Sequence, residues 1–241
     1  MQNNDPFALK TKAIPLNERH FDEMDGQGEL HTQTDAVNRL IRNTYLLLSM
    51  TLLFSAFTAG LAMVFNIPHP GFLLTLVGMM GLFFLTAKLR NSVWGLAAVF
   101  ALTGFMGMTL GPIINHYIQA FSNGHQLVMM AFGTTAVMFL GLSGYALTTR
   151  KDFSFLNGFL MVGLLVAIFG ILAAWLFAIP ALQLAISAVV VLLMAGFILY
   201  DTSNMVNGYE TNYIMATVSL YVNIYNMFVN LLALFGLAGD N

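Results

Sequence analysis

The side chain best suited to chemistry in this sequence is Asp201, a carboxylate near the end of a long apolar segment. Between Phe153 and Gly239 the only other charged residue is Glu210. An ionisable group inside a segment of this kind is costly to bury in a membrane, and it therefore marks a candidate functional site. The alternative is a hydrated carboxylate at the membrane surface, and the sequence leaves both interpretations open.

A stripe of polar side chains occupies the next apolar segment. Its members are spaced by four, three and four residues, which places them on one face of an α-helix: Ser219, Asn223, Asn226 and Asn230. Unpaired amides are costly in hydrocarbon, so this face must meet protein or water. We therefore predict that Asp201 and Asn223 face each other between two helices. They would form a candidate pH-sensing or ion site, which Ser219, Asn226 and Asn230 support.

Two motifs resemble parts of intramembrane protease sites, but each lacks its partner. Gly141–Gly144 reads GLSG, and its Ser143 needs a histidine base from another helix. All five histidines lie in the N-terminal segment or in connections that we place on the other side of the membrane. An aspartyl protease would need a second carboxylate beside Asp201, where the last segment offers Asn223. We therefore expect no catalytic residues and no enzymatic activity.

The composition bears on several other classes of site. The chain has no cysteine, so disulfide and thiol chemistry are excluded. A net charge of −2 indicates no nucleic-acid partner. His116 and His125 share one connection, but two histidines without a third ligand are weak support for a metal site. We therefore expect no metal and no cofactor.

The overall composition is that of a membrane protein. Of the 241 residues 58% are hydrophobic and 8% are charged, whereas roughly a quarter of an average soluble domain is charged. A membrane-spanning helix needs roughly 20 apolar residues. The sequence has seven candidate segments, at Thr44–Asn66, Gly71–Ala87, Val93–Ile114, Gln126–Leu147, Phe155–Ala178, Ala181–Tyr200 and Tyr213–Gly236. We predict an all-α membrane protein, a bundle of seven transmembrane helices. Asn207-Gly208 is a helix stop to which the sixth helix can extend.

The basic residues that flank these segments predict the orientation. All six lie in connections on one side: Arg39, Arg42, Lys88, Arg90, Arg150 and Lys151. The positive-inside rule then places the N-terminus in the cytoplasm and the C-terminus outside. Residues 1–38 are polar and lack apolar periodicity, so we expect a disordered cytoplasmic tail there and a seven-span domain over residues 39–241.

Two groups of glycines predict close contacts between helices, because small residues let transmembrane helices approach. The first group shares one face of the third segment and the second lies near one face of the fourth: Gly104, Gly107 and Gly111, then Gly133, Gly141 and Gly144.

The segment Leu199–Gly236, LYDTSNMVNGYETNYIMATVSLYVNIYNMFVNLLALFG, resembles the Bax inhibitor-1 family of seven-span membrane proteins. GPIINHY at Gly111–Tyr117 and TTRKDFSFLNGFLM at Thr148–Met161 are further matches. Arg42–Ala56 and Glu210–Tyr221 are especially similar to the YccA-like bacterial branch. The resemblance extends from about Arg39 to the C-terminus.

This resemblance implies two functions. YccA-like proteins of the bacterial inner membrane bind the membrane protease FtsH and restrain its proteolysis, with the cytoplasmic tail involved. Other members are proton-sensitive calcium leaks that use two aspartates on the last two spans and a basic latch from the second span. Asp201 matches the first aspartate, Asn223 stands at the second position, and Lys88 or Arg90 would supply the latch.

The missing second aspartate decides between these functions. An asparagine cannot share a proton with Asp201, and one carboxylate is a poor oxygen cage for calcium. We therefore expect a modulator of FtsH. The alternative is a pH-sensitive cation leak channel, centred on Asp201, that passes calcium or protons.

Overall fold

The computed structural model describes the backbone of residues 16–238 and the side chains of residues 33–237 except residues 175 and 180. In this range the chain forms seven helices, each with a stretch long and apolar enough to cross a membrane. They are α1 (Leu16–Val64), α2 (Phe72–Leu89), α3 (Trp94–Ala120), α4 (Gly124–Thr149), α5 (Leu156–Phe177), α6 (Pro180–Val206) and α7 (Tyr213–Ala238). The predicted all-α bundle of seven membrane spans is confirmed.

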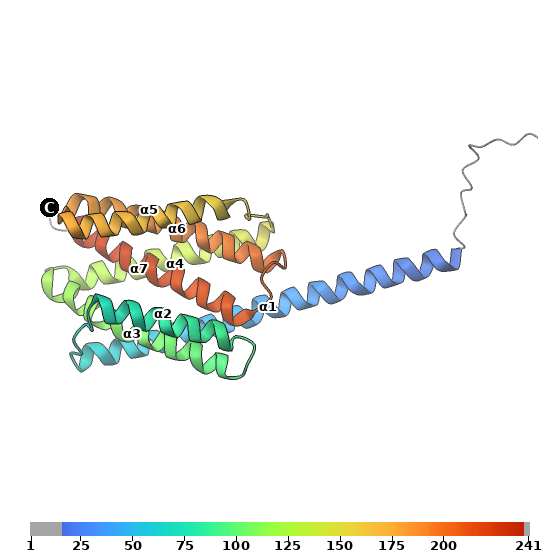
Figure 1. The fold of residues 1–241 in the computed structure, drawn as a ribbon, viewed down its shortest axis with the longest axis horizontal. Helices are drawn as coiled ribbons and strands as arrows, with labels where there is room; N and C mark the ends of the chain where they lie inside the picture. The colour runs from blue at the N-terminus through green and yellow to red at the C-terminus, as the bar shows by residue number, and fades with distance from the viewer. Residues whose placement is uncertain (1–15, 239–241) are drawn as a thin grey trace, which may run out of the picture.

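Helix α7 lies in the middle of the bundle (Figure 1), in contact with α1, α3, α4 and α6. It is the least hydropathic of the seven spans, and half of its most apolar stretch is buried inside the protein. The corresponding buried share is 6% for α2, which packs on α3, and 11% for α5, which packs on α6. The most polar span is therefore shielded from lipid by its neighbours, while α2 and α5 form the lipid-facing flanks.

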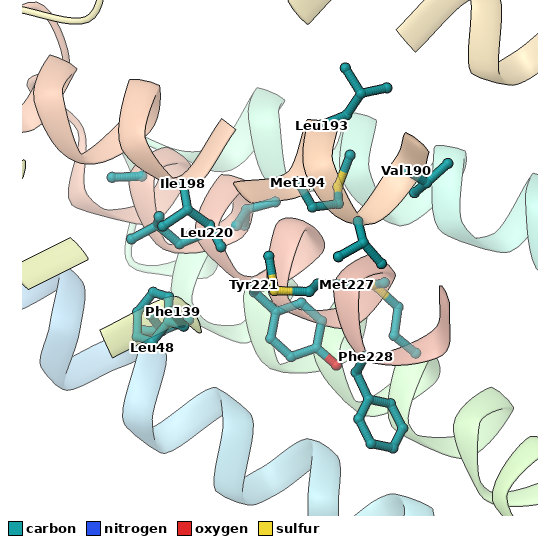
Figure 2. Packing of buried hydrophobic residues seen from close by; sticks show 14 of the residues in the cluster. Leu48, Phe139, Val190, Leu193, Met194, Ile198, Leu220, Tyr221, Met227 and Phe228 are labelled. Atoms are coloured by element: carbon teal, nitrogen blue, oxygen red, sulfur yellow. The ribbon is translucent and has the colours of Figure 1, made fainter. Parts of the chain in front are cut away.

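The apolar core surrounds α7. Figure 2 shows Tyr221, Met227 and Phe228 of this helix among side chains from α1, α4 and α6, including Leu48 and Phe139. These five side chains are all at least 91% buried. Lipid tails are as apolar as leucine, so close packing rather than the hydrophobic effect holds such helices together.

The glycines of α3 let it approach α1 closely. A side-chain carbon added at Gly107 would collide with Thr58 and with the backbone of Ser55, and one added at Gly111 would collide with Ala62 and the backbone of α1. Gly104 lies against the ring of Phe54 in the same way. The predicted close contact is therefore present between α1 and α3.

The glycines of α4 behave differently from the sequence-based expectation. A side-chain carbon at Gly133, Gly141 or Gly144 would meet nothing within 4 Å. Gly133 and Gly141 are exposed toward the lipid and Gly144 is half-buried, and none of the three makes a close helix contact within the described part of the chain. Spacing identifies residues that share a face, but it does not tell which face another helix covers.

Three helix boundaries differ from the predicted spans. Helix α6 continues to Val206, and the turn follows at Asn207 and at Gly208, whose φ is 76°. Helix α3 runs through Pro112 to Ala120. Helix α1 begins at Leu16 and projects from the bundle (Figure 1), whereas the predicted first span begins at Thr44. Residues 1–15 of the predicted tail lie outside the described residues.

Candidate functional site

Asp201 lies on α6, five residues before the helix ends at Val206, and its side chain points at α7. Ser219 Oγ donates a hydrogen bond to Asp201 Oδ2 at 2.6 Å, and Asn223 Nδ2 donates to the same oxygen at 2.7 Å. Both lengths are typical of hydrogen bonds to a charged acceptor. The predicted contact between Asp201 and Asn223 is therefore present, and Ser219 is part of it.

The outer half of the polar stripe does not reach this carboxylate. Asn226 Nδ2 donates to the backbone carbonyl of Val222 at 2.8 Å, and Asn230 Nδ2 donates to the carbonyl of Asn226 at 2.8 Å. Each of these amides thus bonds to its own helix, one turn back. Asn226 and Asn230 were predicted to support the site, but neither of these amide hydrogen bonds involves Asp201.

The basic residues predicted as a latch lie elsewhere. Lys88 and Arg90 are exposed near the end of α2, and among the described residues neither side chain forms a hydrogen bond or ion pair with Asp201. The backbone carbonyl of Arg90 instead accepts a hydrogen bond from Asn212 Nδ2 at 3.1 Å. The structure therefore brings together Asp201, Ser219 and Asn223 but not the basic latch.

A second polar row, which the sequence reasoning missed, lies on the face of α7 that meets α1 and α3. Tyr221 is 1% exposed, and its hydroxyl donates to the carbonyl of Thr103 at 3.3 Å. A tyrosine hydroxyl has one proton. Ser55 Oγ, at 2.6 Å, therefore donates to Tyr221.

Two more residues of this row bind the same neighbours. Thr217 Oγ1 donates to the carbonyl of Thr44 at 3.2 Å, and the Tyr225 hydroxyl lies 3.2 Å from Thr109 Oγ1. Thr217, Tyr221 and Tyr225 are spaced by four residues, which is the signal that would have revealed a second polar face.

The end of α6 and the turn that follows it are joined to the two neighbouring connections at the same end of the bundle. Ser203 Oγ donates to the carbonyl of Lys151 at 3.0 Å and accepts the backbone N–H of Phe153 at 2.9 Å. The Tyr209 hydroxyl donates to Asp152 Oδ2 at 3.1 Å. Asn212 Nδ2 also bonds Asn91 Oδ1 at 2.9 Å.

The contacts of Asp152 shift two pKa values. A hydrogen bond from the backbone N–H of Ser154 is the main cause that lowers the pKa of the Asp152 carboxyl, and the Tyr209 hydroxyl adds to it. The hydrogen bond to Asp152 raises the pKa of the Tyr209 hydroxyl. Both shifts favour the charged carboxylate and the neutral phenol, which is the pair that forms the contact.

The chemistry open to the Asp201 site is the gain or loss of one proton, or a weak hold on a cation. Calcium takes six to eight oxygen ligands, and the described residues contain no group of three histidine, aspartate or glutamate side chains placed to bind a metal. Ser143 Oγ lies 3.3 Å from Thr202 Oγ1, a hydroxyl that cannot replace the histidine base of a serine protease.

The fold and this site define a seven-span helical membrane protein whose last two spans meet at a carboxylate inside the bundle. A family model described as "Inhibitor of apoptosis-promoting Bax1" matches residues 37–240, and the chain belongs to this family. The match confirms the resemblance to the Bax inhibitor-1 family that the sequence analysis identified.

Several relatives match a similar share of the chain. The protein of Escherichia coli K12 named "Modulator of FtsH protease YccA" is 52% identical over 203 residues, which are 84% of this chain and 92% of the relative. Its counterpart in Escherichia coli O6:H1, with the same identity and coverage, is named "Inner membrane protein YccA". A protein of Pseudomonas aeruginosa is 53% identical over 205 residues, covering 85% and 92% of the two chains.

Proposed function

We propose that this chain restrains proteolysis by the membrane protease FtsH, as a non-enzymatic modulator in the bacterial inner membrane. The observation that carries the proposal is the 52% identity, over 84% of the chain, to the protein named as a modulator of that protease. Identity at this level along almost the whole bundle favours a shared function rather than a shared fold alone.

The mechanism that we propose is competition for the protease. The N-terminal segment offers itself to the ATP-driven unfolding machinery, and the bundle then resists extraction from the membrane. Support comes from α1, which runs without interruption from Leu16 into the bundle as far as Val64. A force on the segment before the membrane would therefore act directly on the first span.

The first span is held by polar contacts and by close packing. Ser55 bonds Tyr221, the carbonyl of Thr44 bonds Thr217, and Gly107 of α3 lies against the α1 backbone. A polar contact between membrane helices contributes about 0.6 kcal/mol on average and at most about 1.7 kcal/mol. Several such contacts, together with the cost of leaving lipid, would slow the removal of α1.

The proposed orientation has the N-terminus in the cytoplasm, where FtsH acts on its substrates, and the C-terminus outside. It is supported by the position of the basic connections at one end of the bundle. Ser203 of α6 binds the connection that holds Lys151, and Asn212 of the turn after α6 binds the connection that holds Arg90. A reporter enzyme fused after Asn241 should be active only outside the cytoplasm. Activity inside the cytoplasm would refute the orientation.

Deletion of Met1–Gln33 tests the mechanism. The truncated protein should still insert and fold, because the deletion ends before the buried contacts of α1 begin, and it should no longer prolong the lifetime of an FtsH membrane substrate in cells. A control protein in which the same residues are replaced by a Gly-Ser segment of equal length separates the identity of the segment from its length. Full restraint by the truncated protein would contradict the competition mechanism.

The alternative function, a pH-sensitive cation leak, has one supporting observation, the contact of Asp201 with α7. Asn223→Asp would create two adjacent carboxylates, which titrate as a coupled pair that shares a proton. If a leak path passes here, liposomes with this variant should show a pH-dependent cation flux that Asp201→Asn removes. Equal flux in the wild type and both variants would remove the support for a leak at this site.

A further inference from the structure

Three helices enclose a groove at the end of the bundle from which α1 projects. Its lining includes Asn38 and Ile41 of α1, Leu147 and Arg150 at the end of α4, and Val206 and Asn207 at the end of α6. The volume of the groove is about 180 Å³. Its size suits a phosphate group with the atoms next to it.

The positions of the helix ends place the groove near the lipid headgroups. The fourth candidate membrane span ends at Thr149 and the sixth ends at Val206, and the groove is built from residues close to these two positions. A membrane-spanning helix leaves the hydrocarbon at its terminal residues, where the headgroups begin. A molecule in the groove would therefore meet the membrane surface on one side and the bundle on the other.

The lining combines one cation, carboxamides and apolar side chains. Arg150 and the amide of Asn38 supply hydrogen-bond donors, whereas the Asn207 Nδ2 donates to the carbonyl and the hydroxyl of Ser203. Ile41, Leu147 and Val206 supply apolar surface. Within the described part of the chain the Arg150 guanidinium has no hydrogen bond or ion pair. The groove thus presents an unpaired guanidinium beside apolar walls.

The backbone of Arg150 holds this side chain at an unusual position. Its φ of 50° lies in the left-handed region, where residues other than glycine are uncommon, and its backbone N–H caps α4 at the carbonyl of Ala146. Helices that end this way usually have glycine at the position. Arg150 thus adopts a conformation that costs free energy, as Ala178 does at the end of α5.

A neighbouring hollow adds to the positive charge. It shares Asn38 with the groove and is lined by Arg39 and Arg42 together with one acid, Asp35. Arg39 Nε donates to the backbone carbonyl of Asp35 at 3.3 Å. The groove and the neighbouring hollow together hold three arginines and one carboxylate, and this excess of positive charge favours an anionic ligand.

We propose that this groove binds the headgroup of an anionic phospholipid. The guanidinium of Arg150 would take the phosphate oxygens in a bidentate contact, as arginine does with phosphate, and the Asn38 amide would bond a remaining oxygen or a glycerol hydroxyl. The acyl chains would lie in the bilayer beside the exposed surfaces of α1 and α4. Basic pockets between transmembrane helices are known lipid sites of this kind.

A lipid is favoured over a free phosphate by the apolar part of the lining. Ile41, Leu147 and Val206 offer nothing to an inorganic anion, but they suit the start of an acyl chain. A bound lipid would join α1 to α4 and α6 at the place where α1 leaves the bundle. The inference is independent of any effect on FtsH, because it concerns binding by the purified protein.

Native mass spectrometry of the full-length protein in dodecyl maltoside tests the proposal, with dioleoyl phosphatidylglycerol and dioleoyl phosphatidylcholine as probes. The wild type should prefer phosphatidylglycerol. Arg150→Gln should weaken that binding about tenfold or more, because hydrogen bonds to charged groups contribute about 1.5–3 kcal/mol and 1.4 kcal/mol is a factor of ten. Lys151→Gln is the matched control, since it removes the same charge one residue away, where Lys151 Nζ faces the Tyr145 hydroxyl at 3.5 Å.

The control separates a site from a general surface field. Each basic residue near an anionic surface contributes about 1 kcal/mol, roughly fivefold, wherever it lies. Equal losses for Arg150→Gln and Lys151→Gln, or equal binding of the two lipids by the wild type, would overturn the proposal. Millimolar inorganic phosphate should not displace the lipid, and displacement would refute the lipid as the ligand.

A second pair of variants applies if Arg150→Gln cannot be purified. Leu147→Trp should fill the groove and abolish the preference for phosphatidylglycerol without a change of charge. Its control is Leu140→Trp, on the same helix at a side chain that is 68% exposed, which should bind as the wild type does. Retained preference in Leu147→Trp would refute the groove as the site.

Discussion

Removal of the Tyr221 hydroxyl should loosen the hold of α7 on α1 by a predictable amount. Tyr221→Phe keeps the ring in the core and deletes two hydrogen bonds. The bond from Ser55 at 2.6 Å is short, whereas the bond to the Thr103 carbonyl at 3.3 Å is long for a hydroxyl donor. The loss of stability therefore comes mainly from the bond to Ser55, because the buried Ser55 hydroxyl is left without its acceptor.

The expected loss is about 1–1.5 kcal/mol, since a neutral hydrogen bond contributes about 0.5–1.5 kcal/mol and those between membrane helices average about 0.6 kcal/mol. The free energy of unfolding in mixed micelles of dodecyl maltoside and sodium dodecyl sulfate is the quantity to measure. Tyr225→Phe is the matched control. Its bond to Thr109 is 3.2 Å long, and Thr109 keeps a bond of 2.8 Å to the carbonyl of Met106. The control should lose no more than about 0.5 kcal/mol.

A double-mutant cycle with Ser55→Ala decides whether the hydrogen bond is the cause. Ser55→Ala should cost about 0.5–1.5 kcal/mol in the wild type and close to nothing in the Tyr221→Phe background. An equal cost in both backgrounds would show that the two side chains act separately, and the account of α1 as a span anchored through α7 would then be wrong.

Two further predictions concern packing and pH. Gly107→Leu should lower the free energy of unfolding by about 1–3 kcal/mol, because the new side chain would collide with α1. Gly141→Leu, on the open face of α4, should change it by less than about 0.5 kcal/mol. Equal effects of the two substitutions would refute the close packing of α3 on α1. The contact between Asp152 and Tyr209 should stabilise the connection between α4 and α5 at pH values above the ordinary carboxyl pKa of 3.8, and this stabilisation should be lost as the pH falls through the lowered pKa of Asp152 in the folded protein. The contact should also weaken at high pH, beyond the ordinary phenol pKa of 10.0, as Tyr209 loses its proton. Amide hydrogen exchange at Ser154 should report both limits, and an unchanged acid limit in Tyr209→Phe would exclude the phenol as a contributor.

Much of the fold and the centre of the site followed from the sequence because lipid imposes strict rules. A backbone in hydrocarbon must satisfy its own hydrogen bonds, so apolar segments of sufficient length become helices. The same cost forces polar side chains to find partners, which is why Asp201, Ser219 and Asn223 were predicted together, and Ser219 and Asn223 both donate to Asp201 Oδ2 at 2.6 and 2.7 Å.

Other parts of the site depended on information that spacing does not contain. Tyr221 and Tyr225 are compatible with the core and with the membrane surface, so their hydroxyls gave no clear signal before their neighbours were known. The groove near Arg150 is built from three helix ends that lie far apart in the sequence. The outward direction of the α4 glycines depends on which helices pack beside α4, which a pattern within one segment cannot reveal.

The central position of α7 has a consequence for biosynthesis. This helix is made after the other six, yet α1, α3, α4 and α6 all pack against it. Until it enters the membrane, Ser55 and Thr109 lack the tyrosine hydroxyls that they contact in the finished bundle. The nascent protein therefore passes through a stage in which six spans are inserted around an unfilled centre. Completion of the bundle should be a late and cooperative event, and a chain interrupted before Tyr213 should be recognised by the cell as unassembled.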